Sequence, residues 1–238
     1  MSGLLTERLI QRQINHWNRL REFLPARDAS RPVARGPVIT VSRQAGAGGR
    51  TLAENLAERL GLALHDRSLV EQVVRREKLA PAMVARLDEQ ALSEADLWVQ
   101  GVLRQRIFMR EQYRQALTEV VEEVARGGHV VFLGRGANMV LGMRADLRIR
   151  LVAGPGRRAD RLGRRLGLTA ADACALRDDT DARRDEFVRR LFGCDPADPT
   201  AFDLVLNTDR LDADAVVENV MLGLLAVVAG ERTRVETA

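Results

Sequence analysis

The sequence predicts an α/β fold in which helices cover both faces of a parallel sheet of about five strands. Short apolar, β-rich runs alternate along the chain with longer segments of helical apolar spacing, as in parallel sheets with crossover helices. A glycine-rich turn joins the first such run directly to a helix. The chain has 238 residues, of which 46% are hydrophobic, so it can bury a substantial core.

The N-terminal segment is predicted to be a helix and a linker outside the main domain. Between residues 4 and 24, apolar residues recur at spacings of three and four and would lie on one helix face: Ile10, Ile14, Trp17, Leu20 and Leu24. Prolines then indicate a linker. We assign residues 1–36 to this extension and residues 37–238 to the main domain. The apolar stripe must pack on the chain's own domain or on a second copy, and we favour a homodimer.

The main domain begins with VITVS, residues 38–42, a buried strand bounded by Pro37 and the glycine loop. Further strands are predicted by apolar runs between turn residues, at 62–64, 129–133, 147–153 and 202–208. Helices are predicted between them, at 51–61, 68–78, 93–126, 156–192 and 212–228. The stretch 156–192 is unusually rich in arginine.

Composition restricts the possible partners and compartment. Only one of the 37 basic residues is lysine, Lys78, a bias that a GC-rich genome also produces, so the net charge of +4 is weak support for nucleic-acid binding. Few aromatic residues are available for base stacking. The sequence has no apolar run of membrane-spanning length, no secretion signal, and no metal-type spacing of Cys174 and Cys194. We expect a cytoplasmic protein without membrane or nucleic-acid partners.

The loop VSRQAGAGGRT, residues 41–51, has the layout of a phosphate-binding turn. Glycines let backbone N–H groups turn toward an anion, and the following helix adds partial positive charge. The pattern G-x-x-x-x-G-K-[ST] fits in two registers. In one, Arg50 takes the lysine position and Thr51 the magnesium position. In the other, Gly48 is the glycine before the lysine and Gly49 replaces the lysine itself.

Three motifs in order resemble the cytidylate-kinase-like family of P-loop nucleoside monophosphate kinases. ITVSRQAGAGGRTLAENLAERLGLALHDRSLV resembles the family's first segment, whose loop typically reads S-R-x-x-G-S-G-G-R. VVFLGRGANMVL resembles its second motif, and DPTAFDLVLNTDRL its last strand and the turn that follows. The resemblance runs from about Val38 to Leu225. It implies a three-layer P-loop fold that uses ATP and Mg²⁺ to phosphorylate a nucleoside monophosphate, with CMP or dCMP the first candidates.

This resemblance assigns the loop to the donor nucleotide. We predict that its backbone N–H groups cradle the β-phosphate, that Arg50 supplies the missing lysine's charge, and that Thr51 meets the metal. Arg43, at the loop entrance, is the alternative cation. The predicted ATP-binding set is Arg43, Gly46, Ala47, Gly48, Gly49, Arg50 and Thr51.

The arginine-rich stretch 156–192 falls where such kinases carry a lid over the phosphates. Phosphoryl transfer requires positioning and charge stabilisation, which guanidinium groups provide. RDDTDARR, residues 177–184, resembles the R-D-x-x-D-x-x-R of true cytidylate kinases. The resemblance implies that Arg177 and Arg184 contact phosphate, and that Asp178 and Asp181 orient arginines or the cytidine. With Arg161, these arginines join Arg50 as the predicted catalytic residues.

The residues predicted to bind the phosphoryl acceptor are less typical of the family. In GRGAN, Arg135 is predicted to hold the monophosphate, but Leu133 stands where true cytidylate kinases carry an aspartate. Asp66 matches an acidic position of the family and is predicted to support Mg²⁺ or the acceptor. The acceptor could therefore be another small molecule.

Two other functions compete with a kinase. A nucleotide-binding regulatory protein with weak or no kinase activity is favoured by the missing lysine and the additional N-terminal helix, whereas the arginine lid favours the enzyme. A nucleic-acid-binding protein rests on net charge alone and is the weakest hypothesis.

Overall fold

The computed structural model describes residues 36–66, 69 and 100–236. The predicted N-terminal helix and its homodimer contact lie outside the described residues and stay predictions. The predicted helix 68–78 also lies outside them, except for Leu69.

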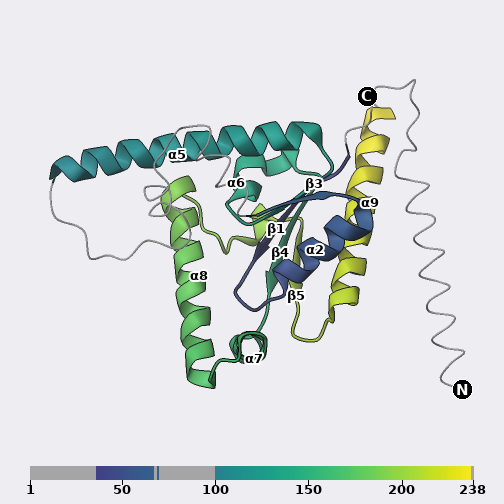
Figure 1. The fold of residues 1–238 in the computed structure, drawn as a ribbon. Helices are drawn as coiled ribbons and strands as arrows, with labels where there is room; N and C mark the ends of the chain where they lie inside the picture. The colour runs from purple at the N-terminus through teal and green to yellow at the C-terminus, as the bar shows by residue number, and fades with distance from the viewer. Residues whose placement is uncertain (1–35, 67–68, 70–99, 237–238) are drawn as a thin grey trace, which may run out of the picture. The chain divides into compact units, whose positions relative to one another are not determined.

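The sheet is the one that the sequence predicts, with five strands, all parallel. The strand order is β2-β3-β1-β4-β5, so β1 lies in the centre (Figure 1). The strands are β1 (Val38–Arg43), β2 (Ala63–His65), β3 (Val130–Leu133), β4 (Leu147–Val152) and β5 (Leu204–Asn207).

Helices connect the strands, and two regions differ from prediction. The described helices are α2 (Gly49–Leu60), α5 (Gln100–Gly127), α6 (Ala137–Leu141), α7 (Pro155–Leu166), α8 (Ala170–Phe192) and α9 (Ala213–Glu236), with short 3₁₀ turns at Gly142–Arg144 and Pro199–Ala201. The short α6 was not predicted. The arginine-rich stretch is two helices, because Gly167 ends α7 in a left-handed conformation and Thr169 caps the start of α8. Among the described helices, none is both long and apolar enough to cross a membrane.

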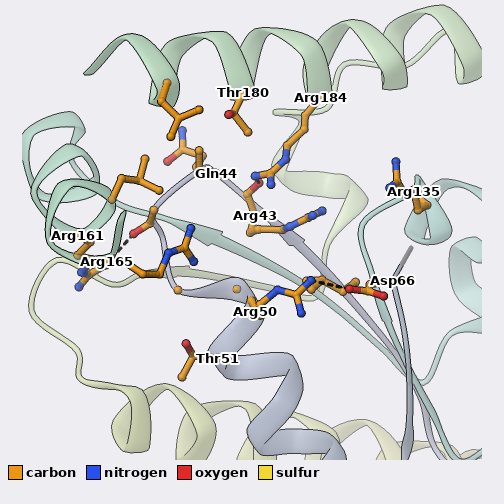
Figure 2. Close-up of a pocket in the computed structure, with 17 residues that line it drawn as sticks. Arg43, Gln44, Arg50, Thr51, Asp66, Arg135, Arg161, Arg165, Thr180 and Arg184 are labelled. Carbon is orange, nitrogen blue, oxygen red and sulfur yellow. Dashed lines mark hydrogen bonds and ion pairs between the residues drawn. The ribbon is translucent and has the colours of Figure 1, made fainter. Parts of the chain in front are cut away.

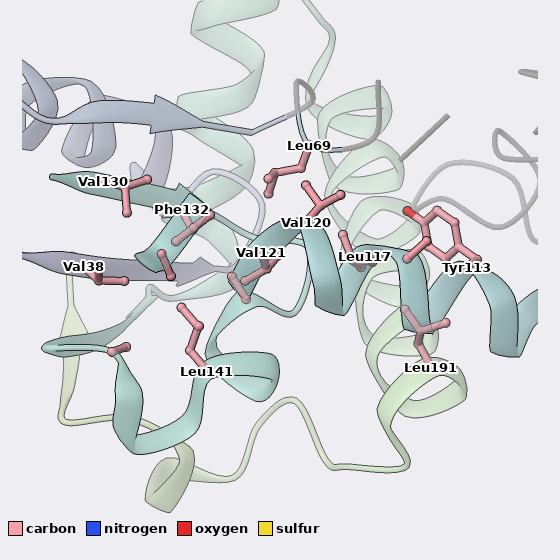
Figure 3. Packing of buried hydrophobic residues seen from close by; sticks show 14 of the residues in the cluster. Val38, Leu69, Tyr113, Leu117, Val120, Val121, Val130, Phe132, Leu141 and Leu191 are labelled. Atoms are coloured by element: carbon pink, nitrogen blue, oxygen red, sulfur yellow. The ribbon is translucent and has the colours of Figure 1, made fainter. Parts of the chain in front are cut away.

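Helices on both faces make a three-layer arrangement. Helices α2 and α9 pack on one face, while α5 and α6 pack on the other and α8 packs on α5. Successive strand residues point to opposite faces, and Val38 and Phe132 enter the core beside α5 with Leu117 and Val121 (Figure 3). These four side chains are fully buried.

The segments that follow β1 and β3 are held against neighbouring strands at the carboxyl edge of the sheet. Gly134, after β3, donates its N–H to the Val41 carbonyl of β1 (3.0 Å), and Gln44, after β1, donates its N–H to the Leu151 carbonyl of β4 (3.1 Å). Parallel sheets bind ligands at this edge. The predicted position of the glycine loop, beside the ends of β3 and β4, is confirmed.

Candidate functional site

The glycine loop has the backbone geometry of an anion-binding nest. Gly46 and Gly48 have positive φ angles of 76° and 87°, which glycine adopts without strain. They alternate with Ala47 and Gly49, and α2 begins at Gly49. Such alternation turns successive N–H groups toward one concave side, and the helix N-terminus adds partial positive charge there.

Hydrogen bonds hold the opposite side of the loop. Ala45 N–H donates to Oδ1 of Asp181 (2.7 Å), and Nη1 of Arg158 donates to the Ala45 carbonyl (3.2 Å). The Thr208 hydroxyl donates to the Ala47 carbonyl (3.1 Å). Ala47 is fully buried, and its N–H donates to the Gln44 carbonyl (3.2 Å). The loop glycines that line the cavity are Gly46, Gly48 and Gly49.

A cavity of about 450 Å³ opens over the loop (Figure 2). Six arginines line it, from the loop, from the turn after β3 and from helices α7 and α8: Arg43, Arg50, Arg135, Arg161, Arg165 and Arg184. Asp66 is the only carboxylate among its described lining residues. A concave, strongly positive site of this kind suits a ligand with several phosphates.

The cavity brings together most of the predicted site residues. Those that line it are Arg43, Gly46, Gly48, Gly49, Arg50, Thr51, Asp66, Arg135, Arg161 and Arg184. Four others do not line it: Ala47, Arg177, Asp178 and Asp181. The face of α8 that reaches the cavity carries Leu176, Thr180 and Arg184, and Figure 2 shows Thr180 and Arg184 pointing from α8 toward the loop.

Arg177 and Asp178 bind each other instead. The Arg177 guanidinium donates two hydrogen bonds of 2.8 Å to the Asp178 carboxylate and another of 2.8 Å to the Pro155 carbonyl. The hydrogen bond from Arg177 holds the pKa of Asp178 below its usual value. In this arrangement Arg177 joins α8 to the first turn of α7.

Arg50 lies at the cavity rim between two carboxylates. Its guanidinium is 2.6 Å from Oδ2 of Asp66 (Figure 2). It is also 3.3 Å from Oε1 of Glu54. The hydrogen bond to Asp66 raises the pKa of Arg50 above its usual value. Because the Arg50 side chain is 53% exposed, solvent screens these pairs. Arg50 was predicted to bind the ATP donor, and Asp66 was predicted to support Mg²⁺ or the acceptor. In the structure these two residues bind each other directly.

Arg161 and Arg184 tie helices α7 and α8 to the loop and the sheet edge. Arg161 donates to the hydroxyl (2.9 Å) and the carbonyl (2.5 Å) of Thr208, and its Nη1 is 3.5 Å from the Gly46 carbonyl oxygen. Arg184 donates to the Arg43 carbonyl over 3.4 Å. Both side chains are therefore held beside the loop.

Arg135 is held in the cavity at the expense of backbone strain. It is 6% exposed and has a φ of 58°, between two glycines that also have positive φ. A left-handed conformation costs a residue with a side chain about 1–2 kcal/mol. Strain of this kind gathers at functional positions.

A matched pair of substitutions isolates this strain. Both Arg135→Gly and Arg135→Ala remove the guanidinium, but only glycine relieves the positive φ. We expect the glycine variant to exceed the alanine variant by about 1 kcal/mol in free energy of unfolding, measured by urea denaturation. Equal stability of the two variants would show that Arg135 bears no strain.

Four side chains that line the cavity or hold the loop were not among the predicted site residues. Arg165 and Thr180 line the cavity, whereas Arg158 and Thr208 hold the loop from behind. Helical spacing could have found the first two, because Arg165 lies four residues after Arg161 and Thr180 four before Arg184. No local pattern identifies Arg158 or Thr208, because their contacts join distant segments.

Comparison with known proteins now identifies the family. The model of the "cytidylate kinase-like family" matches residues 38–210. The chain belongs to this family. It is 28% identical over 190 residues to a cytidylate kinase of Ignicoccus hospitalis, and this match covers 79% of the chain and 99% of the relative. It is 29% identical over 179 residues to a cytidylate kinase of Pyrococcus horikoshii, and that match covers 75% of the chain and 83% of the relative.

Solved structures agree with the family in fold. An uncharacterized protein from Eubacterium ventriosum superposes with a TM-score of 0.61 at 15% identity, covering 79% of this chain and 98% of the other. A gluconokinase from Sinorhizobium meliloti has a TM-score of 0.50 at 14% identity, with 83% and 97% covered. This cytidylate kinase-like chain therefore has the three-layer fold of P-loop kinases.

Proposed function

We propose that this protein transfers the γ-phosphoryl group of ATP to a nucleoside monophosphate in the cytoplasm, with CMP and dCMP as the first candidates. The observation that carries the proposal is the glycine nest beneath a cavity lined by six arginines. Two relatives named cytidylate kinase support the choice of acceptor.

The reaction forms one P–O bond and breaks another. A phosphate oxygen of the monophosphate attacks the γ-phosphorus, and the bond from that phosphorus to the β,γ-bridging oxygen breaks, so that ADP and a nucleoside diphosphate result. The protein's contribution is to align the two phosphates and to neutralise their charge.

The cavity residues divide into donor and acceptor roles. The loop N–H groups between Gly46 and Thr51, without that of the buried Ala47, bind the β-phosphate of ATP. Arg135, in the turn after β3, binds the monophosphate. Arg161 and Arg184 reach the transferring group from the two lid helices, with Arg165 beside them, as guanidinium groups that stabilise developing charge. Asp178 and Asp181 position arginines rather than touch the nucleotide.

Residues suited to Mg²⁺ lie beside the nest. Mg²⁺ in kinases is held largely by phosphate oxygens and water, with one or two protein ligands. The described residues contain no cluster of three or more His, Cys, Asp or Glu that could hold a metal alone. Thr51 and Asp66 both line the cavity and would provide these ligands. When bound, the ion would supply positive charge that helps to neutralise the phosphates.

One observation favours the regulatory alternative. Leu133, 3% exposed, lines the cavity where true cytidylate kinases carry an aspartate, so a polar contact to the acceptor is lost. A site that binds ATP but receives no nucleoside monophosphate would sense nucleotide rather than transfer phosphate.

A coupled ADP-release assay separates these functions. The full chain is assayed with ATP and Mg²⁺ against CMP, dCMP, UMP, AMP, GMP and dTMP. The proposal expects release that depends on CMP or dCMP and falls in Arg135→Ala. ATP binding without acceptor-dependent release for any monophosphate would instead support the regulatory function.

A further inference from the structure

The Arg43 side chain occupies the space that a side chain at position 49 would need. A Cβ built on Gly49 would lie 2.6 Å from both Cβ and Cγ of Arg43 and 3.3 Å from its Cδ. Two carbon atoms do not approach so closely without displacement. A residue larger than glycine at position 49 and the observed Arg43 conformation therefore exclude each other.

The far end of Arg43 depends on a second glycine. A Cβ built on Gly134, at the end of β3, would collide with Nη1 of Arg43 and lie 3.0 Å from its Cζ. Gly134 has a φ of 80°, and its N–H donates to the Val41 carbonyl (3.0 Å), so its backbone position is fixed by the sheet. Arg43 thus passes the start of α2 and places its guanidinium against the end of β3, in the cavity (Figure 2).

The loop geometry selects one register of the phosphate-binding pattern. Gly48 has a positive φ and immediately precedes the first residue of α2. With Gly48 as the glycine before the lysine, Gly49 stands in the lysine position and Arg43 in that of the first glycine. Arg50 then stands in the Ser/Thr position, and Thr51 follows it by one residue, so the role proposed for Thr51 with Mg²⁺ rests on its place in the cavity and not on the pattern. In this loop a positively charged residue stands where the usual pattern has its first glycine, and a glycine stands where the usual pattern has its lysine.

We propose that Arg43 provides the cation that lysine provides in the usual loop, and that it contacts the β- and γ-phosphates of the nucleotide. This inference rests on the proposed function. Arg50, which the sequence favoured for the role, is half exposed and shared between Asp66 and Glu54. Arg43 instead reaches into the cavity past the start of α2, because Gly49 and Gly134 leave it room.

The test is calorimetric titration of the full chain with ATP and Mg²⁺. Arg43→Gln keeps Cβ, Cγ and Cδ, the part of the side chain that passes Gly49, and removes the charged guanidinium. Loss of a charged hydrogen bond should weaken ATP binding about ten- to 150-fold. Arg43→Ala/Gly49→Lys restores a lysine at the usual position and should bind at least about tenfold more tightly than Arg43→Ala alone. Gly49→Lys alone should bind no better than wild type, because Arg43 blocks the new side chain.

The other outcomes each overturn a distinct claim. Wild-type affinity in Arg43→Gln would refute the role of Arg43 and leave the proposed function intact. A large loss in Arg50→Gln but not in Arg43→Gln would assign the cation to Arg50. If Arg43→Ala/Gly49→Lys bound ATP no more tightly than Arg43→Ala, and circular dichroism showed both proteins to be folded, the proposed exchange of the cation and the glycine would be refuted. No ATP binding by the wild type would refute the proposed function itself.

Discussion

Asp181→Ala should lower the free energy of unfolding by about 3 kcal/mol, the usual cost of removing one partner of a buried ion pair. Asp181 bonds Nη1 of Arg158, and its other oxygen accepts the Ala45 N–H. Arg158 is only 7% exposed, so the substitution leaves its charge buried and uncompensated. Urea denaturation measures the loss. Asp181→Asn should lose less, because an amide oxygen can still accept from Ala45.

Asp179→Ala is the matched control on the same helix. Asp179 pairs with Arg183, but these side chains are 48% and 41% exposed. Exposed pairs contribute about 0–1 kcal/mol, so the control should lose less than about 1 kcal/mol. Equal losses in the two alanine variants would contradict the view that Asp181 and Arg158 fasten the lid to the glycine loop.

Gly46→Ala should weaken ATP binding at least about tenfold, which corresponds to about 1.4 kcal/mol. Alanine at a φ of 76° is strained by about 1–2 kcal/mol. In addition, its Cβ would lie 2.5 Å from the carbonyl oxygen of Arg158, a backbone atom that cannot rotate away. The loop must therefore move, and the nest loses its geometry. Calorimetric titration with ATP and Mg²⁺ measures the effect.

Gly61→Ala separates strain from displacement of the loop. Gly61 ends α2 with a φ of 64°, and a Cβ there would meet no atom within 4 Å. This variant should lose about 1 kcal/mol of stability and keep wild-type ATP affinity. If Gly46→Ala bound ATP as tightly as Gly61→Ala, the nest would not be the nucleotide site.

The sheet could be predicted because each strand is a short apolar run with clear turn residues at its ends. VITVS lies in β1, and VVFL, without the predicted His129, lies buried in the sheet as β3. The division of residues 156–192 into two helices was not predicted, although Gly167 and Thr169 are ordinary stop and start signals. The short α6 has too few residues to show helical periodicity.

Local patterns and the family resemblance together predicted much of the site. Glycine spacing indicated the loop, and the resemblance pointed to Asp66 and Arg184, both of which line the cavity. Spacing could not choose between the two registers, because the choice depends on the path of the Arg43 side chain past Gly49 and Gly134. It also could not show that Asp181 turns away from the cavity toward Arg158, which is a contact between two helices.

The central claim is that the glycine nest and its arginines bind ATP, and the most direct measurement is calorimetric titration of the full chain with ATP and Mg²⁺. The account predicts binding at a single site in the wild type, weakened at least about tenfold in Gly46→Ala. A folded wild-type protein that releases no heat and binds no ATP, or a Gly46→Ala variant with wild-type affinity, would contradict it.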